Sequence, residues 1–493
     1  MVNILSADIG TTNVKAGVLD EYGRLKYFTS ERLRILFDQP GSAVQDPDEI
    51  FHRFVNVCKK AVEFVEGNVD ALILSSQMHG LTLLNREGKP IVPLITYLDT
   101  RCSSVVGDIE RDYGRDLYEN TGCPPLFIYP LSKILWLKKT FLHRVKEVKY
   151  VLVSAKDYVI YRLLGKVITD YSTASGSQLF NVKRLDWDSR SLDIAGIQYD
   201  MLPRLVDGFK PLDDVDKGFL KILGISGEPI VMLGGSDAAL HSLGVGVLED
   251  GSLALNLGTS AAIRVTRCKP VVDRYGMRFF CYYLGYKKWI IGGATNNAGS
   301  VLDWLKERLF RERDEEFYDF LEKIDIDTKP CPSLIFIPFL SGERFPVRDS
   351  YARGLVYGLS FNTSREDIIR SALEGIGFTL YWIYAAMNEN NIIAKSIFAA
   401  GGGSRIKLWL RILSNIFNLP LYRASFIDAS LLGGVIVALK EMGYFSSLED
   451  AVKNIVNYGL VFHPKVDYKY AYEKSFRLFK GIYDSIKNTK NLP

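Results

Sequence analysis

The chain has 493 residues, of which 61 are basic and 57 acidic, and its formal net charge is +4. Hydrophobic residues make up 47% and charged residues 24%, which is typical of a globular protein and excludes disorder and collagen-like repeats. Because the basic residues are spread along the chain, nucleic-acid binding is not expected. The length is typical of two or three domains.

Six scattered cysteines form no C-x-x-C pair: Cys58, Cys102, Cys123, Cys268, Cys281 and Cys331. This pattern predicts neither a zinc site nor a disulfide framework, and it is typical of a reducing compartment. The apolar run at the N-terminus is short and is interrupted by Asp8, and no stretch approaches about 18 consecutive apolar residues. We therefore expect a cytoplasmic protein that does not cross a membrane.

A strand, a glycine-threonine turn and a second strand occur twice in the chain. The first unit is 2–9, Gly10-Thr11-Thr12 and 14–20, and the second is 253–257, Gly258-Thr259-Ser260 and 262–266. One unit near the start and one near the midpoint predict two similar domains, each beginning with a hairpin.

Helices and strands alternate along the rest of the sequence. Residues 47–65 predict a helix and 71–75 a strand, and the second half repeats this mixture. The predicted class is therefore α/β. Three glycines between 244 and 251 predict a break, where we place the boundary between domains of residues 1–247 and 248–493.

Both turns are candidate phosphate-binding loops. Gly10 allows the backbone to approach a ligand closely, and N–H groups together with the hydroxyls of Thr11 and Thr12 can bind phosphate oxygens. Gly258 and Thr259 can do the same from the second half. One such turn can equally be an ordinary hairpin turn, whereas two in corresponding positions predict a triphosphate held in a cleft between domains.

Two aspartates lie at the ends of apolar strands. Asp8 precedes the first turn, where a buried carboxylate is costly unless it binds a cation such as nucleotide-bound Mg²⁺; the alternative is an Asx cap of the turn. Asp237 follows the strand 229–233 and begins an alanine-rich helix. It could accept the proton of an attacking hydroxyl, or it could be the N-cap of that helix.

Polar residues at two further strand ends are candidate sugar contacts: Gln77, Met78 and His79 after 71–75, and Asp99 and Arg101 after 95–98. A sugar acid would also need a cation, for which Arg101, or less favourably Lys133, could serve. The alternatives are a buried structural histidine and structural ion pairs.

A third glycine group, Gly401-Gly402-Gly403, follows the strand-like residues 396–398 and could admit a flat ring close to the backbone. It matches neither the G-x-G-x-x-G fingerprint nor a Walker loop.

In chain order these motifs resemble the FGGY family of carbohydrate kinases, within the actin-like ATPase superfamily. The matching segments are 8–12, 78–79, 235–237, 258–260, 342–344 and 401–403. The resemblance implies two actin-like (ribonuclease-H-like) domains that flank a cleft for ATP and sugar, with Asp237 as catalytic base and Asp8 near Mg²⁺. It implies nucleotide contacts from Gly10, Thr11, Thr12, Lys15, Gly258, Thr259, Gly299, Asp303, Gly402, Gly403 and Ile406. Lys15 and Ile406 differ from the residues often seen in glycerol kinases.

Within the family, residues 171–175, 185–188, 258–264 and 292–299 resemble gluconokinases, whereas 77–80 resemble xylulokinases. We expect ATP- and Mg²⁺-dependent phosphorylation of a terminal hydroxyl of a small sugar or sugar acid, with D-gluconate as first candidate and D-xylulose as second. The alternative outside the kinases is an actin-like, nucleotide-dependent regulatory protein. A homodimer is a common state of soluble enzymes and is expected here on that ground alone.

Overall fold

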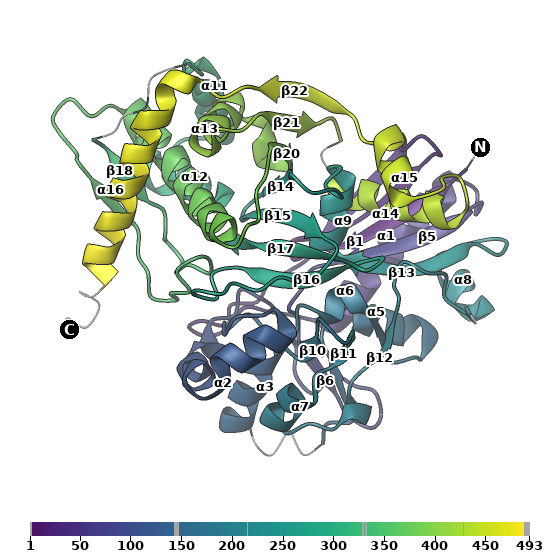
Figure 1. Ribbon diagram of the computed structural model, residues 1–493. Helices are drawn as coiled ribbons and strands as arrows, with labels where there is room; N and C mark the ends of the chain where they lie inside the picture. Colours follow the sequence, from purple (N-terminus) through teal and green to yellow (C-terminus); the bar gives the residue numbers. More distant parts are fainter. Residues whose placement is uncertain are drawn as a thin grey trace.

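The computed structural model of the protein describes residues 2–141, 147–213, 215–327, 330, 333–426 and 428–487. In this part of the chain two large sheets, one in each half, are surrounded by helices (Figure 1). This arrangement is that of an α/β protein.

A five-stranded sheet organises the first half. Its strands, in spatial order, are β13 (Ile230–Ser236), β5 (Ala71–Ser76), β1 (Ile4–Ile9), β2 (Asn13–Leu19) and β3 (Leu25–Arg32). β13, β5 and β1 are parallel, and β2 and β3 continue the sheet as an antiparallel meander. β1 and β5 are buried throughout, as expected for strands covered on both faces.

Helix α1 (Pro47–Phe64) covers one face of this sheet. Asp46 caps the helix by accepting a hydrogen bond from the Asp48 N–H, and Pro47 fits the first turn, which needs no donor there. Buried side chains such as Ile50 and Phe54 pack on Leu5 and its neighbours, and each stabilises the fold by about 1.5–3 kcal/mol.

Helix α14 (Ala429–Glu441), although it belongs to the second half, packs against β1 and β5 and against α9 (Asp237–Gly244). Glycines make this close contact possible: a Cβ on Gly433 would lie 1.9 Å from the Leu240 carbonyl oxygen, and one on Gly434 would lie 2.7 Å from Ser6 Oγ. Because neighbouring strand residues point to opposite faces, Ser6 faces α14 while Leu5 faces α1.

A seven-stranded sheet organises the second half. Its strands, in spatial order, are β16 (Phe280–Gly285), β17 (Lys288–Thr295), β15 (Ala261–Arg267), β14 (Ser252–Leu257), β20 (Ser396–Ala400), β21 (Leu421–Ala424) and β22 (Tyr458–Phe462). The β14–β15 hairpin with parallel β20 repeats the arrangement of the β1–β2 hairpin with parallel β5. The two halves therefore share a topology, as the repeated turns predicted.

The other helices are α2 (Val106–Thr121), α3 (Pro130–Thr140), α5 (Ala155–Leu164), α6 (Tyr171–Ala174), α7 (Ser189–Ala195), α8 (Lys217–Leu223), α10 (Gly299–Trp304), α11 (Asp314–Lys323), α12 (Arg365–Glu389), α13 (Lys407–Phe417), α15 (Leu448–Ile455) and α16 (Lys469–Lys487). Short strands are β4 (Val44–Gln45), β6 (Thr82–Leu84), β7 (Leu94–Ile95), β8 (Tyr150–Leu152), β9 (Ile168–Asp170), β10 (Phe180–Asn181), β11 (Asp186–Trp187), β12 (Arg204–Val206), β18 (Ile335–Ile337) and β19 (Leu355–Tyr357).

Two predicted strands have different bounds in the structure. The strand expected at 95–98 is only the two-residue β7, because the chain turns at Thr96 to enter the 3₁₀ helix at Arg101–Val105. The strand expected at 229–233 continues as β13 to Ser236 through a bulge at Gly234, whose φ is +64°. The division at residues 247 and 248 stays a prediction; it falls between α9 and β14.

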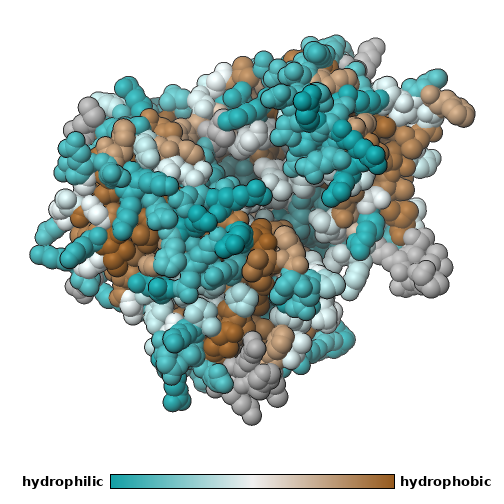
Figure 2. Space-filling model, turned by 180° about the vertical axis from the view of Figure 1, so that it is seen from behind, coloured by the Kyte–Doolittle hydropathy of each residue, from teal (hydrophilic) through white to brown (hydrophobic). Residues whose placement is uncertain are grey.

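The face seen from behind mixes hydrophilic and hydrophobic residues and has a hollow near the middle of its upper part (Figure 2). Scattered apolar residues of this kind are normal on a folded protein. Among the helices that the structure describes, none is both long and apolar enough for a membrane span.

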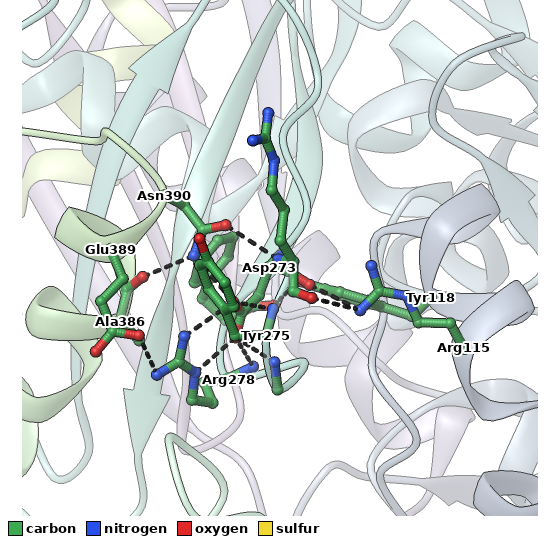
Figure 3. Close-up of polar contacts among 11 residues, drawn as sticks. Arg115, Tyr118, Asp273, Tyr275, Arg278, Ala386, Glu389 and Asn390 are labelled. Carbon is green, nitrogen blue, oxygen red and sulfur yellow. Dashed lines mark hydrogen bonds and ion pairs between the residues drawn. The ribbon is translucent and has the colours of Figure 1, made fainter.

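A polar network around Asp273 joins the two halves (Figure 3). From α2, Arg115 donates a hydrogen bond to the Asp273 carbonyl oxygen at 3.0 Å, and the Tyr118 hydroxyl accepts one from the Asp273 N–H at 2.6 Å. The Asp273 carboxylate accepts hydrogen bonds from Arg278 at 2.7 Å and from Asn390, next to the end of α12, at 2.9 Å. The contact therefore links α2 of the first half to the loop of Asp273 and to Asn390 in the second half.

Candidate active site

Two cavities lie next to the glycine-threonine turns. The larger, of about 670 Å³, is lined by residues of the second half. The sequence-predicted residues among them are Gly258, Thr259, Gly299, Asp303, Gly402, Gly403 and Ile406. The smaller, of about 110 Å³, is lined by residues of both halves. The predicted residues among these are Thr11, Gln77, Met78, His79 and Asp237.

Close backbone packing shapes the larger cavity. The Gly299 N–H donates to the Gly258 carbonyl at 3.0 Å, and a Cβ on Gly299 would lie 2.6 Å from that oxygen. A Cβ on Gly403 would lie 2.8 Å from the Trp409 ring, whereas one on Gly402 would meet nothing within 4 Å. The glycines thus bring the second turn, α10 and the 401–403 loop together around a space large enough for a nucleotide base and sugar.

A ring of hydrogen bonds holds the first turn. Thr11 Oγ1 donates to Gln77 Oε1 at 2.6 Å, the Gln77 amide donates to Gln45 at 3.0 Å, and the Gln45 amide donates to the Thr11 carbonyl at 2.8 Å. A Cβ on Gly10 would lie 2.9 Å from the Asn13 carbonyl oxygen, so this tight turn favours glycine. Thr12 lines neither of the two cavities; its carbonyl accepts from the Leu33 N–H.

His79 is buried and neutral beside the smaller cavity. Its Nδ1–H donates to the Gly176 carbonyl at 2.7 Å, and burial lowers its pKa to about 3. A Cβ on Gly176 would lie 2.3 Å from the terminal methyl of Met78 and 3.1 Å from the His79 ring, so a larger residue would force Met78 to move. His79 is therefore a hydrogen-bonded, buried histidine that also borders the cavity.

Asp237 is the first residue of α9, and its carboxylate borders the smaller cavity. The N-cap is the preceding Ser236, whose hydroxyl accepts from the Ala239 N–H at 3.2 Å. Burial and the charge of Asp8 together raise the pKa of Asp237 to about 6, although Arg264 and Lys156 act to lower it. Its carboxylate is thus suited to exchange a proton near neutral pH.

Asp8 on β1 is buried, and its Oδ1 atom has no hydrogen-bond partner. Burial raises its pKa, against the opposing charge of Lys15. An unpaired buried carboxylate oxygen suits a bound cation. Among the described residues no group of three acidic, histidine or cysteine side chains could hold a metal ion. Mg²⁺ in kinases needs only one or two carboxylates besides substrate phosphates, so Asp8 fits that role.

The comparisons with known proteins agree with this geometry. The pattern of the FGGY family of carbohydrate kinases matches residues 3–244 with its N-terminal domain and residues 253–442 with its C-terminal domain. The chain belongs to the FGGY family of carbohydrate kinases. Its predicted two-domain, actin-like α/β fold and its assignment as a sugar phosphotransferase are thereby confirmed.

Known gluconate and xylulose kinases are similar to this FGGY kinase over nearly their whole length. Gluconokinase from Bacillus subtilis (strain 168) is 33% identical over 468 residues, which are 92% of this chain and 90% of that protein. The gluconate kinase structure from Lactobacillus acidophilus is 30% identical with a TM-score of 0.91, covering 98% of both chains. The ligand-bound xylulose kinase structure from the same organism is 30% identical with a TM-score of 0.92, covering 99% of both chains.

Three predicted residues of the FGGY kinase have other contacts. Lys15 on β2 forms an ion pair with Asp428 at 2.6 Å and lines neither of the two cavities. Arg101 forms an ion pair with fully buried Asp99 at 2.6 Å and lies over the Trp136 ring. Asp99 and Arg101 likewise do not border the smaller cavity, so the structural ion pair considered above is what is observed.

Two buried lysines hold backbone carbonyls near the site. Lys133, whose pKa burial lowers to about 8, donates to the carbonyls of His79 and Ile95. Lys156 donates to the carbonyls of Leu233 and Gly235 at 2.9 Å each, on both sides of the bulge at Gly234. Lys156 also pairs with buried Asp170 at 2.7 Å. Sequence reasoning missed Lys156, which fixes the strand end that carries Asp237.

Two arginines that line the smaller cavity were also not predicted from the sequence as site residues. Arg264 lies on β15, and Arg344 follows Glu343 in the second of the ordered motifs of the second half, residues 342–344. The signal was present, because a charged residue within the apolar strand Ala261–Arg267 is unusual unless it is paired or functional.

Proposed function

We propose that this kinase transfers the γ-phosphoryl group of ATP to a terminal hydroxyl of D-gluconate, giving 6-phosphogluconate. The observation that carries the proposal is Asp237, a partly buried carboxylate with a pKa of about 6 that borders a small cavity between the two glycine-threonine turns. Thr11 of the first turn and Ser260 of the second border the same cavity.

In this proposal the larger cavity takes the nucleotide. Gly299, Asp303, Gly402, Gly403 and Ile406 would surround its base and ribose. The two turns would bind its phosphates through backbone N–H groups and hydroxyls, from Gly10, Thr11 and Thr12 on one side and from Gly258 and Thr259 on the other. Asp8 would hold Mg²⁺, which neutralises phosphate charge when bound.

Asp237 acts as the general base. It accepts the proton of the sugar hydroxyl while the hydroxyl oxygen forms a bond to the γ-phosphorus, and the bond from phosphorus to the β–γ bridging oxygen breaks to release ADP. The small size of the cavity supports exclusion of water, which would otherwise compete for the phosphoryl group.

Gluconate is proposed over other sugars because of the similarity to the B. subtilis gluconokinase and the L. acidophilus gluconate kinase. D-Xylulose is the second candidate. It is favoured by the 77–80 segment, of which Gln77, Met78 and His79 border the cavity, and by the equally close L. acidophilus xylulose kinase.

The test is ADP release from ATP and Mg²⁺ with D-gluconate, other aldonates, D-xylulose, D-ribulose, glycerol or no sugar. We expect a selective response to gluconate and slow hydrolysis without sugar. A selective response to xylulose would retain the mechanism and refute the substrate. Equal ADP release with and without sugar would refute the proposed exclusion of water.

We also propose a cytoplasmic location and a homodimer. The first is supported by Cys58, Cys102, Cys123, Cys268 and Cys281, which are free thiols; Cys331 lies outside the described residues. Light scattering of the purified protein tests the second, and a monomer at micromolar concentration would refute it.

A further inference from the structure

Arg264 and Arg344 bring two guanidinium groups to the small cavity of Asp237. Both are nearly buried, with 8% and 7% of their surfaces exposed. Arg264 Nε and Nη1 and Arg344 Nε have no hydrogen-bond partner. Among the described residues neither arginine takes part in an ion pair within 4.0 Å, although Arg344 lies over the Tyr97 ring.

A buried guanidinium without hydrogen bonds is costly, because it has lost its hydration and gained no acceptor in return. Arg101 in the same protein illustrates the usual solution, since its Nε donates to Asp99 Oδ1 and its Nη2 donates to Asp99 Oδ2. Unpaired donors of this kind in a cavity are expected where a ligand supplies the acceptors.

The charges that border the cavity indicate the sign of that ligand. Two arginines face one carboxylate, Asp237, and His79 is neutral. The lining therefore has an excess of one positive charge, which suits a ligand with one negative charge and not a neutral ketose.

We infer that Arg264 and Arg344 form a carboxylate-binding subsite, which holds the acid group of an aldonate while its far hydroxyl reaches Asp237. This inference rests on the proposed function and deepens it. A guanidinium presents N–H donors in a fixed fork that matches the two oxygens of a carboxylate. The subsite comes from the second half of the chain, whereas Asp237 comes from the first, so both halves contribute to binding one substrate.

The test compares D-gluconate with D-glucitol, which has the same carbon skeleton but a neutral hydroxymethyl group in place of the carboxylate. At about pH 8.5, where Asp237 with its pKa of about 6 stays ionised even without the charge of Arg264, we expect kcat/KM for gluconate to fall about 10- to 100-fold in Arg264→Gln and Arg344→Gln, while kcat/KM for glucitol changes by less than about 3-fold. Calorimetric binding of gluconate without ATP should weaken by a similar factor. Arg267→Gln is the matched control, because Arg267 lies on the same strand but pairs with exposed Asp250.

Equal losses for gluconate and glucitol would overturn the subsite and assign the arginines to the phosphoryl group or to Asp237, while the proposed function stands. Selectivity of the wild-type enzyme for D-xylulose over gluconate would refute both. Should a variant fail to fold, binding measurements on the wild-type enzyme still test the subsite. The wild-type enzyme should bind gluconate at least about 10-fold more tightly than glucitol, and equal affinities would overturn the subsite.

Discussion

Asp237, which is partly buried, and Asp273, which is fully buried, both lie close to residues of the other half of the chain, yet their surroundings act on them in opposite directions. Burial raises the pKa of Asp237 to about 6, and among the residues that the structure describes only the Ala238 N–H donates to its carboxylate. Burial also raises the pKa of Asp273, but hydrogen bonds from Arg278, from backbone N–H groups and from Asn390 lower it to about 2 (Figure 3).

This difference separates a carboxylate that holds the structure from one that is free to act. Asp273 is saturated with donors, so its ionised form is stabilised and it has no capacity left for a ligand. Asp237 lacks donors, so its ionised form is costly and its proton affinity lies near neutral pH. Four predictions test the comparison, in order of decreasing effect.

The largest effect is expected for Asp237→Asn. Removal of the base should lower the rate of phosphoryl transfer about 10²- to 10⁴-fold, as measured by ADP release with sugar. ATP binding, measured by calorimetry, should change little, and thermal stability should not fall, because the costly buried charge is removed. Transfer within about 3-fold of wild type would contradict the role of Asp237 as the base.

Asp273→Asn should show the reverse pattern. We expect a loss of about 2 kcal/mol of stability, because charge-assisted hydrogen bonds to Arg278 and the loop are weakened, with phosphoryl transfer largely kept. The pKa of Asp273 is depressed, so its contribution is present above about pH 4 and is lost as the pH falls towards 2. Thermal unfolding of both proteins between pH 3 and 7 measures this, and a difference unchanged across that range would contradict it.

The pH dependence of kcat/KM should show an acidic limb from Asp237, with activity falling below about pH 6 as the base becomes protonated. Because the charge of Lys156 lowers this pKa, Lys156→Met should move the limb to higher pH. Lys133→Met is the matched control, since Lys133 is also buried but donates to the carbonyls of His79 and Ile95 and not to the strand that leads into Asp237. A limb that shifts equally in both variants would refute the electrostatic role of Lys156.

The smallest effect is expected for Asn390→Ala, which removes one donor to Asp273. The loss of stability should be about 1 kcal/mol, seen as a slightly lower unfolding temperature. Asn388→Ala, at an exposed position of α12, is the control and should have no comparable effect. If both variants behave alike, the hydrogen bond to Asp273 contributes nothing measurable.

The sequence predicted those parts of the site that lie in local motifs. The two turns, Asp237 and the 401–403 loop are each recognisable from strand ends and glycines, and residues of each line one of the two cavities; Asp8 is recognisable in the same way but lines neither. The sequence alone could not predict contacts between segments that are far apart in the chain. Lys15 and Asp428 meet across 413 positions, and Lys156 reaches the carbonyl of Leu233 from another element.

Arg101 and Arg264 show why residue type alone misassigns a cation. Arg101 begins a 3₁₀ helix and Arg264 lies in the middle of β15, but Arg101 has Asp99 two positions away, and this local partner neutralises it. Arg264 has no acid nearby in the sequence, and only the packing of β15 against its neighbours decides that its side chain borders the cavity.

The position of α14 has a consequence for how the chain can be divided. A fragment that ends at residue 247 would contain the whole five-stranded sheet but lack the helix that covers one face of β1 and β5. That face would be an exposed apolar surface and a site of aggregation. The first half therefore completes its core only after residue 441 has been synthesised, so folding of the two halves is coupled even though each has its own sheet.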